Sequence, residues 1–254
     1  MLTGILLLSI MTFVGFISYR RPRFEQRVFK KIPLADWITI LVIPIVMYVG
    51  IILIVINILA RPRIPILDFD DKTFIVFGLL FLLYGFVGTS MHFVSKVISR
   101  YIKGTNSMVY HVNEIFHGKL SHYLTFCSTL LVIFFTALLE INYPTAGRLT
   151  ELQMIILILA GLLFGLSSSK AIFYTHRWVG GYTKPLFLLV TVLLLVTYGI
   201  FQTFGLDLSV YPVNLFVSAL LGSIVVTFVT RQLFILMRLE KRRRLKFIGK
   251  ILSA

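Results

Sequence analysis

The residue types best suited to chemistry in this sequence are its histidines. His111, Glu114 and His117 follow one another at intervals of three residues. On an α-helix such residues share a face, so two imidazoles and a carboxylate would converge there. Imidazole nitrogens and a carboxylate are suitable ligands for Zn or Fe, and the carboxylate can instead serve as a general base. The spacing predicts a His/Glu metal site in which Glu114 is also the candidate catalytic residue.

Two further histidines, His92 and His122, lie at the edges of neighbouring apolar segments. From adjoining helices they would add nitrogen ligands, so the predicted metal set is His92, His111, Glu114, His117 and His122. Glu114 and His117 also match half of the Glu-x-x-His pattern of ferritin-like di-iron bundles, but a second copy is missing, so a full di-iron site is not expected. The structural alternative is an amphipathic interfacial helix that carries these residue types on its wet face.

A haem site is a second interpretation of two of these histidines. The segment KLSHY, residues 119–123, is similar to the start of the ligand-bearing helices in membrane b-type cytochromes. The resemblance covers five residues and implies haem b with His122 as one axial ligand and His92 as the other. The protein would then be an electron-transfer subunit with a single haem, because the sequence holds no second transmembrane histidine pair.

Two arginines are candidates for binding an anionic group of a substrate. Arg177 lies in a loop, residues 170–184, that is rich in glycine and aromatic residues. Arg231 is followed by five apolar residues near the end of the last apolar segment. The structural alternatives are a turn anchored at the membrane interface for Arg177, and an aliphatic stem that lets Arg231 reach that interface.

A third functional class is a non-enzymatic channel, transporter or assembly subunit. One face of the fourth apolar segment carries a line of polar side chains from one end to the other: His122, Thr125, Thr129, Thr136 and Glu140. Polar groups inside a membrane bundle often mark proton or ion paths. The sequence contains no P-loop, no Gly-x-Ser-x-Gly and no His-Glu-x-x-His motif, and its single cysteine excludes an internal disulfide.

The elements that must position these residues are membrane helices. The chain has 254 residues, of which 58% are hydrophobic and only 14% charged, so an ordinary soluble enzyme is excluded. Seven apolar segments have about the 17 to 25 residues needed to cross a bilayer. They cover residues 2–18, 37–60, 74–94, 121–141, 152–169, 186–204 and 213–237. Asp36 is the expected cap of the second, and Thr150 with Gln153 forms a capping box before the fifth.

The basic residues predict how these helices are oriented. Counted over the alternating ends of the segments, 20 Lys and Arg fall on one side and four on the other. By the positive-inside rule the basic side is cytoplasmic, which places the N-terminus outside. Because the net charge of +15 is gathered beside apolar segments, we expect anionic lipid head groups rather than nucleic acid as its partner.

The predicted fold class is therefore all-α, a polytopic membrane protein with seven transmembrane helices and a short interfacial helix before the fourth. Residues 1–237 form the transmembrane domain and residues 238–254 a basic cytoplasmic tail. We expect the protein in a cytoplasmic membrane of the prokaryotic kind.

Overall fold

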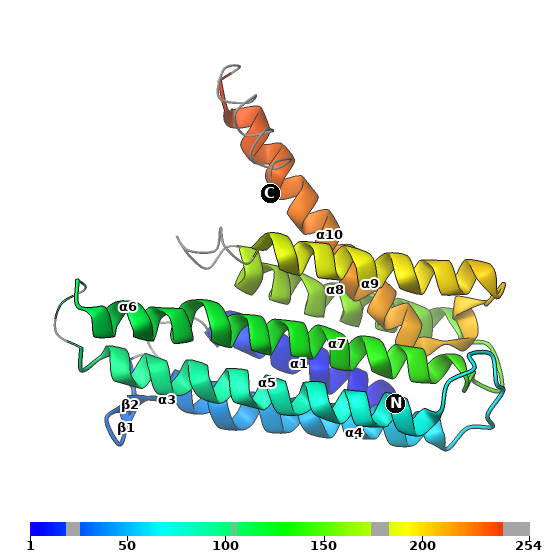
Figure 1. Ribbon diagram of the computed structural model, residues 1–254. Coiled ribbons are helices and arrows are strands. Elements are labelled where there is room, and N and C mark those ends of the chain that lie inside the picture. The colour runs from blue at the N-terminus through cyan, green and yellow to red at the C-terminus, as the bar shows by residue number, and fades with distance from the viewer. Residues whose placement is uncertain (19–25, 103, 105, 174–182, 241–254) are drawn as a thin grey trace.

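The computed structural model describes residues 1–18, 26–102, 104, 106–173 and 183–240, and it is almost entirely helical. The long helices lie side by side in a bundle, and α10 crosses it obliquely (Figure 1). In chain order the helices are α1 (Leu2–Ser18), α3 (Leu34–Trp37), α4 (Ile43–Leu59), α5 (Asp71–Ser99), α6 (Met108–Glu114), α7 (Ser121–Ile141), α8 (Glu151–Phe173), α9 (Thr183–Thr203) and α10 (Pro212–Arg238). Two short strands, β1 (Val28–Phe29) and β2 (Ile32–Pro33), pair as an antiparallel hairpin.

Among the described residues, six helices are long and apolar enough to cross a membrane. They span residues 34–59, 71–99, 108–141, 151–170, 185–203 and 212–238. By length and composition the chain is a multi-pass membrane protein, as the sequence predicts. The first predicted span forms α1, a helix of 17 residues that is shorter than these six. The predicted basic tail lies outside the described residues from position 241 onward.

The predicted interfacial helix does not exist as a separate element. Helix α6 continues through a π-helical segment, η2 (Ile115–Leu120), directly into α7, and the three form one rod of 34 residues. At 1.5 Å per residue this rod is about 50 Å long, which exceeds the hydrocarbon thickness of a bilayer. No proline interrupts the segment, and the wider turn of η2 absorbs Gly118 without ending the helix. Ser107 caps its start by accepting a hydrogen bond from the Tyr110 amide.

Helix α7 is the most buried element and α5 packs along it. Small residues allow the closest crossings: a Cβ on Gly88 of α5 would lie 2.8 Å from the backbone of Thr125 on α7. Gly161 and Gly165 of α8 meet the backbone of α10 in the same way, so this GxxxG pair serves helix packing. The capping box of Thr150 and Gln153 is present, with both of its hydrogen bonds formed.

One end of the bundle, called here the glutamate end, is organised around Glu140. Its side chain is fully buried, and its Oε2 accepts hydrogen bonds from the amides of Val213 (2.8 Å) and Asn214 (3.0 Å) in the first turn of α10. Its Oε1 forms an ion pair with Arg61 at 3.1 Å, and Arg61 also donates to the Tyr143 carbonyl. A carboxylate from α7 therefore binds the N-terminus of α10 and the segment that follows α4 at once.

The residues next to Glu140 hold the loop between α4 and α5. The Asn142 side chain accepts from the amides of Ile66 and Leu67 and donates to the Leu67 carbonyl. The Tyr143 hydroxyl donates to Asp71 at 2.6 Å. Burial and this contact raise the pKa of Tyr143, so the hydroxyl keeps its proton as the donor. The glutamate end is thus closed by hydrogen bonds that join the end of α7 to the α4/α5 loop, the start of α5 and the start of α10.

Candidate functional site

Three histidines from three parts of the fold meet at the opposite end of the bundle, called here the histidine end. His92 comes from α5, His117 from η2 and His122 from the first turn of α7. The ring centroids of His92 lie 4.6 Å from those of His117 and 4.8 Å from those of His122. The His117 and His122 rings are 6.3 Å apart. The structure therefore brings together three of the four histidines in the predicted metal set.

The π-helical segment η2 explains how His117 and His122 face the same neighbour. Residues five apart on a regular α-helix point about 140° away from each other. The wider i to i+5 turn of η2 reduces this divergence, and such segments often occur at functional sites. The Nδ1 of His122 lies 3.0 Å from the Gly118 carbonyl oxygen, and the Ser121 hydroxyl donates to the His117 carbonyl. These contacts hold the backbone between the two rings.

Two ring nitrogens in this cluster have no hydrogen-bond partner. The Nδ1 atoms of His92 and His117 are both buried and unpaired. Glu114 approaches His117, but its Oε1 is 3.6 Å from Nδ1, which is too far for a hydrogen bond. Buried polar atoms without partners are uncommon in proteins and costly, so these two nitrogens are suited to contact a bound molecule.

The remaining predicted site residues lie elsewhere. His111 is exposed on α6 with its ring against Tyr110, apart from the other histidines. Arg231 is half-buried in the last third of α10, the part of that helix that leaves the bundle in Figure 1. Arg177 lies outside the described residues, as does His176. Among the described residues, α10 packs mainly on α8 and α9 and has no extensive contact with α5 or α6, the helices beside the histidines.

A buried charge cluster beside the histidines is a feature that the sequence prediction missed. Asp36 is 4% exposed and pairs with Lys96, at 2.5 Å, and with Arg100, both on α5. The expectation that Asp36 caps the second span is wrong, because it lies inside α3 and its carboxylate turns to these cations instead of to backbone amides. Asn113 of α6 donates to the Ser95 carbonyl, which joins α6 to the same stretch of α5. A signal in the sequence that could have indicated this cluster is the recurrence of polar residues at helical spacing near the end of α5, at His92, Ser95, Lys96 and Ser99.

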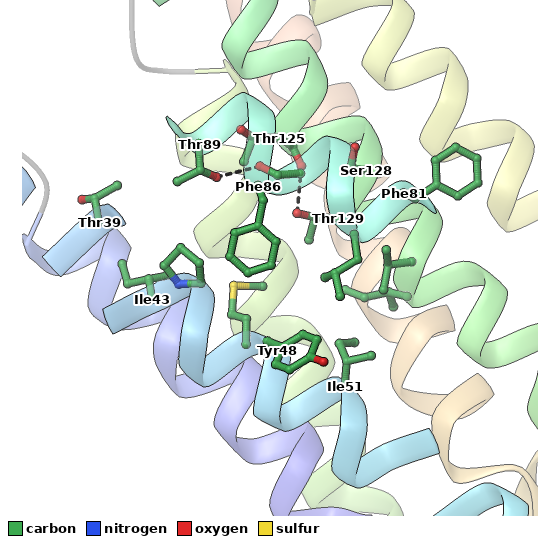
Figure 2. Close-up of a pocket in the computed structure, with 16 residues that line it drawn as sticks. Thr39, Ile43, Tyr48, Ile51, Phe81, Phe86, Thr89, Thr125, Ser128 and Thr129 are labelled. Atoms are coloured by element: carbon green, nitrogen blue, oxygen red, sulfur yellow. Dashed lines mark hydrogen bonds between the residues drawn. The ribbon is translucent and has the colours of Figure 1, made fainter. Parts of the chain in front are cut away.

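A cavity of about 170 Å³ lies between the π-helical segment η1 (Ile38–Val42), α4, α5 and α7, and its polar part leads toward the histidines. Figure 2 shows hydroxyl-bearing residues on its α5 and α7 side, Tyr48 and Ile51 of α4 opposite, and the Phe86 ring between them. The hydroxyl groups belong to Thr89, Thr125, Ser128 and Thr129. Thr89 is three residues before His92 and Thr125 three residues after His122. The histidines thus lie about one helical turn beyond the cavity.

A second cavity of about 140 Å³ continues toward the glutamate end. It shares Tyr48, Ile51, Leu82 and Val132 with the first cavity, and its other walls are apolar except for Thr136. The two cavities form one groove, called here the α4/α5 groove. It exists because α4 and α5, although consecutive, pack on α1 and α7 rather than on each other. The Tyr48 and Phe86 rings, 6.5 Å apart, bridge it.

The cofactor predictions can be compared with this geometry. Within the described ranges, no three His, Cys, Asp or Glu side chains are arranged to hold a metal ion. The His92 and His122 rings are 4.8 Å apart with 35° between their planes, which leaves no space for a porphyrin between them. The residues therefore do not fit haem b as a pair of axial ligands. Zn or Fe binding stays a prediction that metal analysis can test.

The polar line along α7 is interrupted, which bears on the channel interpretation. Thr125 and Thr129 line the first cavity, but Val132 and Ile133 separate them from Thr136. Glu140 is engaged with Arg61 and the start of α10, so its carboxylate serves the packing of helices.

Comparison of the chain with protein-family models, curated proteins and solved structures found no match.

Proposed function

We propose that this protein binds a lipophilic molecule in the α4/α5 groove and uses the histidine cluster to transfer protons at the polar end of that molecule. One observation carries the proposal: the groove ends one turn from His92 and His122, where buried nitrogens of His92 and His117 lack partners. Apolar pockets with a few convergent polar groups are typical ligand sites. Histidine is the commonest general acid or base near neutral pH, because its neutral ring accepts a proton and its protonated ring donates one.

The charges around the cluster indicate what kind of polar end fits. Lys96 and Arg100 are already engaged by Asp36, and Glu114 lies beside His117. Two cations and two carboxylates leave this region without a strong excess of either charge. The site therefore favours an uncharged ester, amide or hydroxyl group over a phosphate. In this scheme His92 and His117 contact the reacting group, and the Glu114 carboxylate lies beside the His117 ring as a nearby negative charge.

The groove can be tested by filling it without disturbing the helices. A Cβ placed on Gly78, which lines the second cavity, would meet no atom within 4 Å. Gly78→Leu should therefore fold at least as well as the wild type, since leucine favours helix more than glycine does. A diazirine-bearing fatty alcohol should label wild-type protein on peptides of α4, α5 and α7. We expect Gly78→Leu to lose most of this labelling.

The matched control is Gly199→Leu on α9, because a Cβ at Gly199 also meets no atom within 4 Å and this residue does not line the groove. It should keep wild-type labelling. Equal labelling of both variants, or wild-type labelling spread evenly over all helices, would exclude the groove as the binding site.

We also propose that α1 is a seventh span and that the histidine end faces the cytoplasm. Helix α1 packs on α4 and α8, and its 17 residues reach the lower limit for crossing a bilayer. At the glutamate end, Arg61, Arg63 and Arg148 are each paired with a carboxylate. The loops and tail predicted to lie at the histidine end carry 20 Lys and Arg in the sequence, which supports the assignment of that end to the cytoplasm.

Fusion reporters test this topology. A reporter after Ala254 should behave as cytoplasmic, and one inserted at Gly147, an exposed loop position at the glutamate end, as external. A cytoplasmic reporter at Gly147 together with an external one after Ala254 would place the histidine cluster at the other face of the membrane. A cytoplasmic result at both sites would mean an even number of crossings between them.

A further inference from the structure

The β1–β2 hairpin at the histidine end has an unusual turn. Its two loop residues, Lys30 and Lys31, both have positive φ angles, 47° and 64°. Such angles at both central positions are those of a type I′ turn, for which Asn and Gly are the favoured residues. Lysine is a poor choice there, because its Cβ crowds the backbone in the left-handed region. Two adjacent cations are therefore present at positions where turn stability favours other residues.

The hairpin backbone is nevertheless tied to the bundle. The Trp37 indole N–H donates to the Phe29 carbonyl at 3.2 Å, and Arg100 donates to the Lys31 carbonyl at 3.5 Å. Trp37 in turn packs on Phe93 of α5, with ring centroids 5.7 Å apart. Side chains from α3 and from the end of α5 thus hold the hairpin through its carbonyl groups. The Phe29 ring also meets Trp37 edge-on, with centroids 6.2 Å apart, but more than half of its surface stays exposed.

The uncovered side chains combine apolar and cationic groups. Val28 is 59% and Phe29 60% exposed, and Lys30 and Lys31 follow them directly and are exposed as well. The hairpin lies at the same end of the bundle as α6 (Figure 1), beyond the apolar part of α5, where a membrane helix meets the head groups. Exposed apolar side chains beside lysines are typical of segments that dip into an anionic interface.

We infer that the β1–β2 hairpin is a binding site for the head group of an anionic phospholipid. Val28 and Phe29 lie at the boundary of the acyl chains, and Lys30 and Lys31 contact the lipid phosphate. Since Lys30 and Lys31 are neighbours on a fixed turn, both can approach one phosphate without ordering a flexible loop. The site is separate from the α4/α5 groove, so it does not depend on the proposed function.

The turn itself supplies the test. Replacing the pair by Lys30→Asn and Lys31→Gly removes both charges and introduces the residues that a type I′ turn prefers, so the hairpin should be retained. The full chain is placed in nanodiscs that hold equal amounts of phosphatidylglycerol and phosphatidylcholine, and the lipids retained on release are counted by native mass spectrometry. Wild type should retain phosphatidylglycerol preferentially. The variant should lose about fivefold in this preference for each lysine removed, or about 25-fold in total.

Two controls make the result specific. Lys72→Asn with Arg148→Gln removes two charges at the glutamate end and should leave the preference at this site unchanged. In a Trp178→Phe background Trp37 is the only tryptophan, and its emission should match between variant and parent if the hairpin is intact. An undiminished phosphatidylglycerol preference in the Asn-Gly variant overturns the inference, as does an equal loss in the charge control. Retention of free phosphate in place of the lipid would likewise overturn it.

Discussion

Replacing Glu140 with alanine is expected to lower the free energy of unfolding by about 3–5 kcal/mol, the loss that accompanies removal of one partner from a buried ion pair. The variant would leave Arg61 without its carboxylate in a region where its side chain is only 12% exposed. The amides of Val213 and Asn214 would also lose their acceptor at the first turn of α10. Each buried donor left unpaired adds to the cost.

The measurement is equilibrium unfolding in mixed micelles, followed by loss of helical signal. The control is Glu151→Ala, which removes an exposed glutamate in the first turn of α8 and should change stability by no more than about 0.5 kcal/mol. Arg61→Met provides the reciprocal variant, and the double variant should cost less than the two single losses combined. Equal stability of Glu140→Ala and Glu151→Ala would contradict the structural role assigned to Glu140.

The largest expected effect on function is at the histidine cluster. If His92 and His117 transfer protons to a bound lipophile, His92→Ala and His117→Ala should each lower the rate of its conversion by about 10²- to 10⁴-fold, the usual contribution of general acid–base catalysis. Labelling of the groove by the diazirine-bearing fatty alcohol should remain, since neither residue lines the cavities. Conversion would be followed by mass spectrometry of a polar lipid extract incubated with purified protein.

His111→Ala is the matched control, because His111 is exposed on the same rod and lies apart from the cluster. It should retain the wild-type rate.

Metal analysis of the same preparations tests the predicted Zn or Fe site at these residues. Near-stoichiometric Zn or Fe that is lost in His117→Ala and His122→Ala would favour a metal centre over proton transfer by imidazole alone. If no preparation converts any lipid in the extract, the catalytic part of the proposal fails while groove labelling tests binding separately.

Features that depend on neighbours in the chain could be predicted from the sequence. The apolar segments predict the helices because a membrane requires long runs without charge, and six of them meet this requirement in the structure. The capping box of Thr150 and Gln153 forms because both of its hydrogen bonds lie within one turn. Gly85 and Gly88 of α5 lie against Ser128 and Thr125 of α7, because small residues let two membrane helices approach closely.

Features that depend on contacts between distant residues were decided only by the tertiary structure. Asp36 looked like a helix cap, but Lys96 and Arg100, more than 55 positions away, determine where its carboxylate points. Glu140 looked like the end of a polar path, whereas Arg61 and Asn214 make it the centre of a buried junction. The predicted stripe of His111, Glu114 and His117 assumed a regular surface helix, and a π-helical turn inside a longer rod separated His111 from the rest. The α4/α5 groove has no sequence signature, because it forms where α4 packs on α1 and α5 packs on α7 instead of on each other.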